Sequence, residues 1–79
     1  MKTKRVVADI AAIIRKERRK RKLKKALIAR ATGVKPLWLR RTEGGKRRIY
    51  IDEFLTLADA IGFDAVRAIR KLVRRRAKG

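Results

Sequence analysis

Residues 32–48, TGVKPLWLRRTEGGKRR, interleave Lys and Arg with apolar side chains between two glycine-containing turns. Lysine and arginine donate charged hydrogen bonds and accept none, so this stretch is suited to binding anionic oxygens such as those of phosphate. The chain contains no Cys, no His and no glycine run of the kind that cradles phosphates. It therefore lacks a catalytic constellation and clustered metal ligands. We expect a binding protein that is not an enzyme and that uses no cofactor and no metal ion.

The charge balance indicates what the protein binds. The chain has 26 Lys plus Arg against 7 Asp plus Glu, a formal net charge of +19. Self-repulsion of that size opposes a compact fold, so a polyanionic partner explains it best, and nucleic acid is the commonest polyanion. A solubilising surface and an anionic membrane are the alternatives. Residues 15–25 are strongly basic, whereas five of the seven acids lie between residues 43 and 64. We expect a basic face and a more neutral back.

Length and hydropathy limit the organisation of the chain. Its 79 residues correspond to one domain, residues 1–79, without repeats or long linkers. The longest apolar stretch, VVADIAAII, is interrupted by Asp9 and is too short to span a bilayer. No cleavable signal pattern follows it. We expect a cytoplasmic, nucleoid-associated protein that does not enter membranes.

Apolar residues recur at three- and four-residue spacing, which predicts helices and no strands. The first helix is expected over about residues 5–20, and a short second one over 23–31, ended by Gly33. The third begins at Pro36 and stops before Gly44. The fourth spans 51–61, the last follows Asp64, and a basic tail over 74–79 is expected to fray. The sequence therefore predicts an all-α fold of five short helices.

The second and third helices, within about residues 24–43, are joined by a short glycine-containing turn. This arrangement describes a helix-turn-helix, although the spacing alone also suits other small helical bundles. From Ile10 to Phe63 the chain resembles the lambda-repressor/Cro-like DNA-binding domains, and it is similar in length to small controller regulators of mobile elements and restriction systems. The segments that carry the resemblance are IIRKERR, LKKALIARATGV, LWLRRTEGGKRR and FLTLADAIGF.

The resemblance implies a compact five-helix domain that regulates transcription, for example as a repressor. Such domains bind near-palindromic operators as dimers, with the second helix of the motif in the major groove. The residues expected to face the bases are Lys35, Pro36, Leu37, Arg40 and Arg41. Those expected to contact phosphates are Lys24, Lys25, Trp38, Lys46, Arg47 and Arg48. Arg41 is the best candidate for reading a guanine, because its planar fork matches the O6 and N7 acceptors. A phosphate contact is its alternative role, and Trp38 is also expected to cover the core.

Further residues take their roles from the same resemblance. Arg18 and Glu43 are expected to form an internal ion pair, against the alternative of an exposed Glu43. The homodimer interface is expected on the last helix, at Ala65, Val66, Ile69, Leu72 and Val73. The chain departs from the family pattern at three positions. Lys25 replaces a common glutamine, Lys22 a common glycine, and Lys35 the usual N-cap serine.

Two other functions are compatible with a basic helical chain. A non-specific nucleic-acid-packing or RNA-binding protein would also be basic. RNA-binding modules usually expose aromatic side chains for stacking, and this chain has few aromatic residues, mostly at core-like positions. A membrane-active cationic peptide would not need the turns and helix caps seen here. The sequence therefore favours double-stranded DNA as the partner.

Overall fold

Five helices account for most of the chain in the computed structural model, which describes residues 3–78, with side chains from 5 to 77. They are α1 (Thr3–Lys20), α2 (Lys25–Thr32), α3 (Pro36–Glu43), α4 (Ile51–Ile61) and α5 (Ala65–Lys78). No strand occurs in the described residues. The predicted all-α class and the number of helices are confirmed.

The short connections follow from residues that tolerate tight turns. Gly33, directly after α2, has a φ of 75°, in the left-handed region that glycine adopts without a steric penalty. Pro36 then occupies the first turn of α3, where a missing N–H costs nothing. Lys22, between α1 and α2, also has a positive φ, 57°, although it carries a side chain. Lys22, which stands where the family commonly has a glycine, therefore adopts a conformation that favours glycine.

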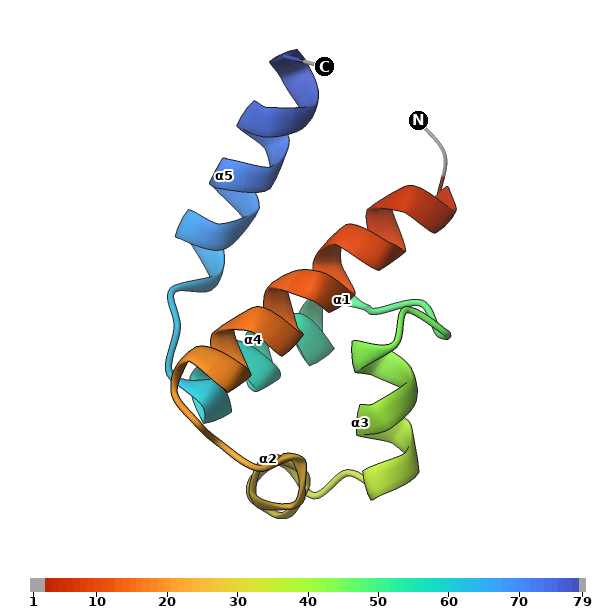
Figure 1. The fold of residues 1–79 in the computed structure, drawn as a ribbon, viewed down its shortest axis with the longest axis vertical. Coiled ribbons are helices and arrows are strands. Elements are labelled where there is room, and N and C mark those ends of the chain that lie inside the picture. Colours follow the sequence, from red (N-terminus) through yellow and green to blue (C-terminus); the bar gives the residue numbers. More distant parts are fainter. Residues whose placement is uncertain (1–2, 79) are drawn as a thin grey trace.

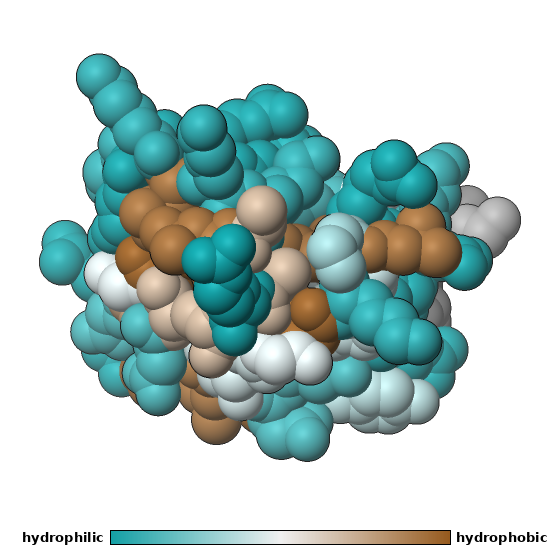
Figure 2. Space-filling model, turned by 90° about the horizontal axis from the view of Figure 1, so that it is seen from below, coloured by the Kyte–Doolittle hydropathy of each residue, from teal (hydrophilic) through white to brown (hydrophobic). Residues whose placement is uncertain are grey.

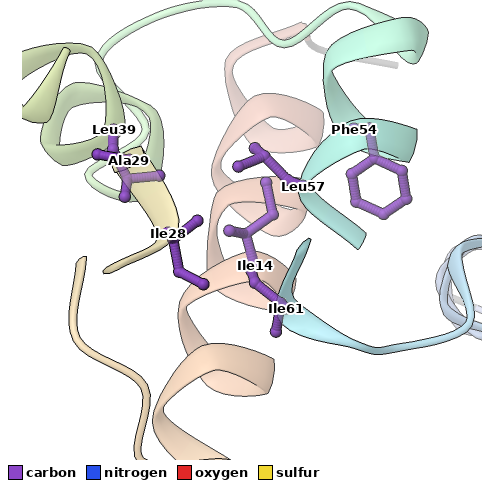
Figure 3. Packing of buried hydrophobic residues seen from close by; sticks show 7 residues of the cluster. All are labelled: Ile14, Ile28, Ala29, Leu39, Phe54, Leu57 and Ile61. Carbon is purple, nitrogen blue, oxygen red and sulfur yellow. The ribbon is translucent and has the colours of Figure 1, made fainter. Parts of the chain in front are cut away.

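The hydrophobic core lies where α1 meets α2, α3 and α4. Ile14 of α1 is fully buried and projects between Ile28 of α2 and the side chains of α4 (Figure 3). The seven residues of the cluster are Ile14, Ile28, Ala29, Leu39, Phe54, Leu57 and Ile61. Because each short helix contributes only one to three of them, none of these helices is stable by its own packing alone. The core therefore sets the orientation of α2 and α3 jointly.

The helices are arranged so that α2 and α3 form one end of the molecule (Figure 1). α2 packs against α3 and α4, and α3 packs against α1. α5 packs on α4 and extends away from α2 and α3 (Figure 1). The outer surfaces of α2 and α3 are therefore not covered by the last helix.

The prediction of a frayed basic tail is wrong for residues 74–78, because α5 continues to Lys78. Residue 79 lies outside the described residues. Arg76 Nη1 donates a hydrogen bond to Asp9 Oδ2 of α1 at 2.7 Å, and Leu72, one turn earlier, is buried. Basic side chains are also favourable near a helix C-terminus. The last turns of α5 are therefore held by a contact with α1 that is remote in sequence.

Candidate nucleic-acid interface

α3 presents a row of exposed side chains while its opposite face is anchored in the protein. Leu39 and Thr42 have no exposed surface, and Glu43 is 3% exposed. The five residues expected to face DNA bases are all exposed: Lys35, Pro36, Leu37, Arg40 and Arg41. This division follows from the helical period, because positions three and four apart share a face. α3 is therefore a fixed helix whose cations and one leucine point outward.

The C-terminal end of α3 is fixed to α1 by the ion pair that the family resemblance implies. Arg18 donates from Nε to Glu43 Oε2 at 2.6 Å and from Nη2 to Oε1 at 2.8 Å. Its remaining Nη1 donates to the carbonyl oxygen of Leu23 at 2.8 Å. Arg15 Nη1 donates to the backbone oxygen of Glu43 at 2.7 Å. The acid beside the basic surface is therefore buried, neutralised and unavailable to repel phosphate.

Both helices of the motif begin at a lysine that cannot cap them. Lys24 and Lys35 are the N-cap residues of α2 and α3, and neither makes a side-chain cap hydrogen bond. The first N–H groups of a helix have no intrahelical partner, and lysine offers no acceptor to satisfy them. A phosphate oxygen is a suitable acceptor at such an end, where the helix dipole also favours negative charge. Lys24, Lys25 and Lys35 are exposed around these two ends.

Arg47 is less exposed than the cations on either side of it and is paired within the protein, and its expected phosphate contact stays a prediction. Its guanidinium carbon lies 4.5 Å from the centroid of the Trp38 ring. Its Nη1 and Nη2 donate to Glu53 Oε1 and Oε2, both at 3.1 Å, and Nη1 also reaches Thr42 Oγ1 at 3.3 Å. A guanidinium held by a carboxylate and an aromatic face has its charge neutralised within the protein. Arg47 therefore ties the 44–50 loop to α3 and α4.

Trp38 is half-buried and packs against the core cluster, as expected for a residue that covers it. Its indole N–H makes no hydrogen bond among those found in the described residues, so a phosphate contact stays a prediction. Lys46 and Arg48, on either side of Arg47, are exposed. Their expected phosphate contacts also stay predictions.

Glu53 has an ordinary role in local structure besides its pairing with Arg47. Its Oε1 accepts the backbone N–H of Tyr50 at 3.0 Å, which satisfies a donor at the start of α4. The hydrogen bonds from Arg47, followed by the one from Tyr50, hold the pKa of the Glu53 carboxyl below its ordinary value of 4.5, while partial burial opposes them. Glu53 is therefore ionised at neutral pH and keeps Arg47 in place.

The end of the molecule that carries α2 and α3 is seen face-on in Figure 2. Hydrophobic side chains gather within a surround that is largely hydrophilic (Figure 2). The exposed large hydrophobic residues of these two helices are Leu27 and Leu37, at 50% and 54% exposure. An apolar contact among cations is useful in a DNA groove, where thymine methyl groups alternate with hydrogen-bonding edges.

The residues expected to form a dimer interface differ in their exposure. Val66 and Val73 of α5 are 61% and 59% exposed, whereas Ala65 and Ile69 are half-buried against the core cluster. Leu72 is 5% exposed and is buried in the protein's own fold, so its expected place in a dimer interface stays an untested prediction that this burial does not favour.

Two residues of α4 belong to the same exposed surface and were not predicted. Ile51 and Leu55 are 67% and 47% exposed, and with Val66 and Val73 they line a groove of about 540 Å³ between α4 and α5. Their spacing of four residues was the available signal, because it places them on one side of α4. The apolar surface is therefore built by two helices and not by α5 alone.

Within the described residues, no group of three acidic side chains is positioned to hold a metal ion. None of the helices described is both long and apolar enough to cross a membrane. Over this part of the chain, the basic surface of α2 and α3 is the most developed candidate site.

One comparison with known proteins bears on this surface. A family model described as a helix-turn-helix domain matches residues 9–70, which include α2, α3 and both members of the Arg18–Glu43 pair. No curated protein matches the chain.

Proposed function

This chain belongs to the helix-turn-helix domain family, and from that membership we propose that it is a sequence-specific transcriptional regulator that binds operator DNA as a dimer. The family indicates DNA binding. The finer statement, that α3 lies in the major groove of a near-palindromic operator and reads bases there, is our proposal.

A single observation supports the proposal that α3 reads bases. The exposed residues at the start and on the outer side of α3 are Lys35, Leu37, Arg40 and Arg41. On its other side Leu39, Thr42 and Glu43 are buried and fix the helix against the rest of the protein. Reading bases requires side chains held in a fixed register, whereas neutralising phosphates requires only charge. Non-specific packing would not need a recognition helix anchored by a buried ion pair. The geometry of α3 therefore favours sequence-specific binding over packing.

The surrounding cations suit the phosphate backbone. Lys24 and Lys25 flank the start of α2, and Lys46 and Arg48 lie in the loop after α3. Contacts of this kind orient a protein on the duplex without reading its sequence. We assign these four residues to phosphate contacts and Arg41 to a base contact.

Dimerisation is proposed through the groove surface of α4 and α5. The exposed Ile51, Leu55, Val66 and Val73 form an apolar surface of the kind that marks an interaction site on a soluble domain. Two copies on half-sites about one helical turn apart would multiply the selectivity of one short recognition helix. Repulsion between copies that carry +19 each opposes association, and duplex phosphates would screen it. We therefore expect weak dimers in solution and firm ones on DNA.

Footprinting on the DNA that flanks the protein's own gene tests the regulatory proposal. We expect two protected half-sites about 10 base pairs apart, centre to centre. The log–log salt dependence of binding should have a slope of about −0.9 for each phosphate contacted. Uniform protection without discrete sites would favour the packing alternative, and a flat salt titration would exclude nucleic-acid binding altogether.

The dimer is tested separately with Val73→Asp, compared with Val73→Leu as an apolar control. Asp lowers the net positive charge, so charge alone would strengthen association, whereas a lost apolar contact would weaken it. We expect Val73→Asp to abolish cooperative filling of the two half-sites and Val73→Leu to retain it. Sedimentation showing one protein per operator for the unmodified chain would contradict the dimer.

A further inference from the structure

A second groove lies between α1 and α5. It encloses about 850 Å³. Its apolar lining comes from Ala12, Ile13, Ala68 and Leu72, with α1 and α5 each contributing two residues. This is a different surface from the α4–α5 groove assigned to dimerisation, and the two grooves share no lining residue.

Basic side chains surround this apolar floor. The groove is lined by Arg5, Lys16, Lys71 and Arg75, and none of them has a carboxylate within 4.0 Å among the described residues. The two acids that line it are both engaged. Asp9 pairs with Arg76 at 2.7 Å, and Glu17 pairs with Arg21 at 2.6 Å. The groove therefore has a surplus of positive charge that the protein does not neutralise.

This charge lies away from the proposed DNA-reading surface. α5, which forms one wall of the groove, extends away from α2 and α3 (Figure 1). Screening at physiological salt acts over about 8 Å, so phosphates bound at α3 would do little to neutralise cations that lie farther along α5 than that. Like charges gathered around a groove oppose folding. A separate anionic partner would account for their placement.

We propose that the groove between α1 and α5 is a docking site for an acidic amphipathic helix of a partner protein. A helix that lies in a groove between two helices buries one apolar face, and the flanking side chains provide specificity. Here the apolar face would cover Ile13 and Ala68, and carboxylates on its edges would meet Lys16, Lys71 and Arg75. The groove offers an apolar floor and a basic rim, and this partner uses both.

Other occupants match the groove less well. α5 of a second copy is excluded by charge, because the AVRAIRKLVRRRAK segment contains seven basic residues and no acid. The phosphates of a second DNA duplex would pair with the basic side chains around the groove. They would not bury the apolar residues at its base.

The test uses the intact protein and a synthetic helical peptide of about 14 residues, the length of roughly four helical turns. The peptide carries leucines at helical i, i+3, i+4 and i+7 spacing and glutamates at most other positions. A scrambled peptide of identical composition keeps the charge and loses the apolar face. Fluorescence anisotropy should show binding of the amphipathic peptide about tenfold or more tighter than of the scrambled one, because the anchor contacts dominate affinity.

Two double variants locate the binding site. Lys16→Glu with Lys71→Glu reverses charge at the groove. Arg19→Glu with Arg67→Glu makes the same total charge change on the same two helices, outside the groove lining. We expect the groove variant to weaken peptide binding by at least about tenfold and the control variant by much less. Circular dichroism should show both variants folded. Amide shifts induced by the peptide should centre on residues 12–13 and 68–72.

Several results would overturn the proposal. Equal binding of the two peptides, or equal losses in the two double variants, would reduce the interaction to non-specific charge. Displacement of the peptide by a random-sequence duplex, together with selective loss of duplex binding in the groove variant, would assign the groove to a second DNA. Absence of peptide binding would also refute it. None of these measurements depends on α3 reading an operator, so the proposed function stands or falls separately.

Discussion

The guanidinium of Arg18 is buried against the carboxylate of Glu43, with two parallel hydrogen bonds of 2.6 and 2.8 Å. The residues are 25 positions apart, and the pair joins the last turn of α1 to the last turn of α3. Removing one member would leave the other as an uncompensated buried charge. The orientation of α3 therefore depends on an interaction buried inside the protein.

Glu43→Ala should lower the free energy of unfolding by roughly 3–5 kcal/mol, the usual cost of breaking a buried pair. Thermal and urea unfolding would measure it. Glu17→Ala is the matched control, because its partner Arg21 directly follows α1 and this more exposed pair should be worth only about 0.3–0.5 kcal/mol. An unchanged melting temperature for Glu43→Ala would mean that the pair contributes nothing to stability.

Lys22→Gly should stabilise the protein, because Lys22 adopts a φ of 57°. A left-handed conformation costs a residue with a side chain roughly 1–2 kcal/mol, and the greater freedom of glycine in the unfolded chain offsets part of the gain. We expect a net increase of about 0.5–1 kcal/mol in the free energy of unfolding, measured with urea. Lys16→Gly, inside α1, makes the same substitution at a helical position and should destabilise by about 1 kcal/mol. Destabilisation by both variants would argue against strain at Lys22.

Arg47→Ala and Arg48→Ala should affect different properties although they are neighbours. Arg47 is held by Trp38 and Glu53, so its loss should reduce stability by about 1–2 kcal/mol and shift the fluorescence of the single tryptophan. Arg48 is exposed, so its loss should leave stability unchanged and weaken binding to all duplexes about equally. If Arg47→Ala left both stability and fluorescence unchanged, the contacts of Arg47 with Trp38 and Glu53 would not be formed in solution.

Glu53 should make stability depend on pH in the acidic range. Its pKa in the folded protein is lowered by Arg47 from the ordinary value of 4.5. A carboxyl with a depressed folded pKa contributes its stabilisation fully above the unfolded pKa, and the contribution is lost as the pH falls through the folded pKa. We therefore expect urea midpoints of the unmodified protein and Glu53→Gln to differ most above about pH 4.5 and to converge below it. A difference that is constant with pH would contradict this assignment.

Arg41→Ala should cost roughly 1–3 kcal/mol on the operator and remove discrimination at one base position. Lys25→Ala, its counterpart for a phosphate contact, should weaken specific and random DNA by similar factors. Gel-shift titrations on the operator, on single-base variants and on random duplex would measure both. Equal losses on specific and random DNA for Arg41→Ala would reassign Arg41 to the phosphate backbone.

The sequence alone determined the features that depend on neighbouring residues. The recurrence of apolar residues and the positions of Gly33, Pro36, Gly44 and Gly62 were sufficient to predict five helices and their approximate ends. Helix formation responds to spacing and to turn residues over a few positions, both of which can be read from the chain. The net charge of +19, which needs no structure, was sufficient to predict a polyanionic partner.

Tertiary structure decided the features in which a side chain has several possible partners. Arg47 and Arg48 are adjacent and chemically identical, yet only Arg47 meets Trp38 and Glu53. Leu72 and Val73 are also adjacent and apolar, and only Leu72 is buried. The apolar arc of α5 is wide enough to pack on either side, and the placement of α1 and α4 determines which side is covered. Those helices are distant from α5 in sequence. The groove between α1 and α5, and the continuation of α5 to Lys78, therefore depend on packing between distant segments, which the local spacing of residues does not reveal.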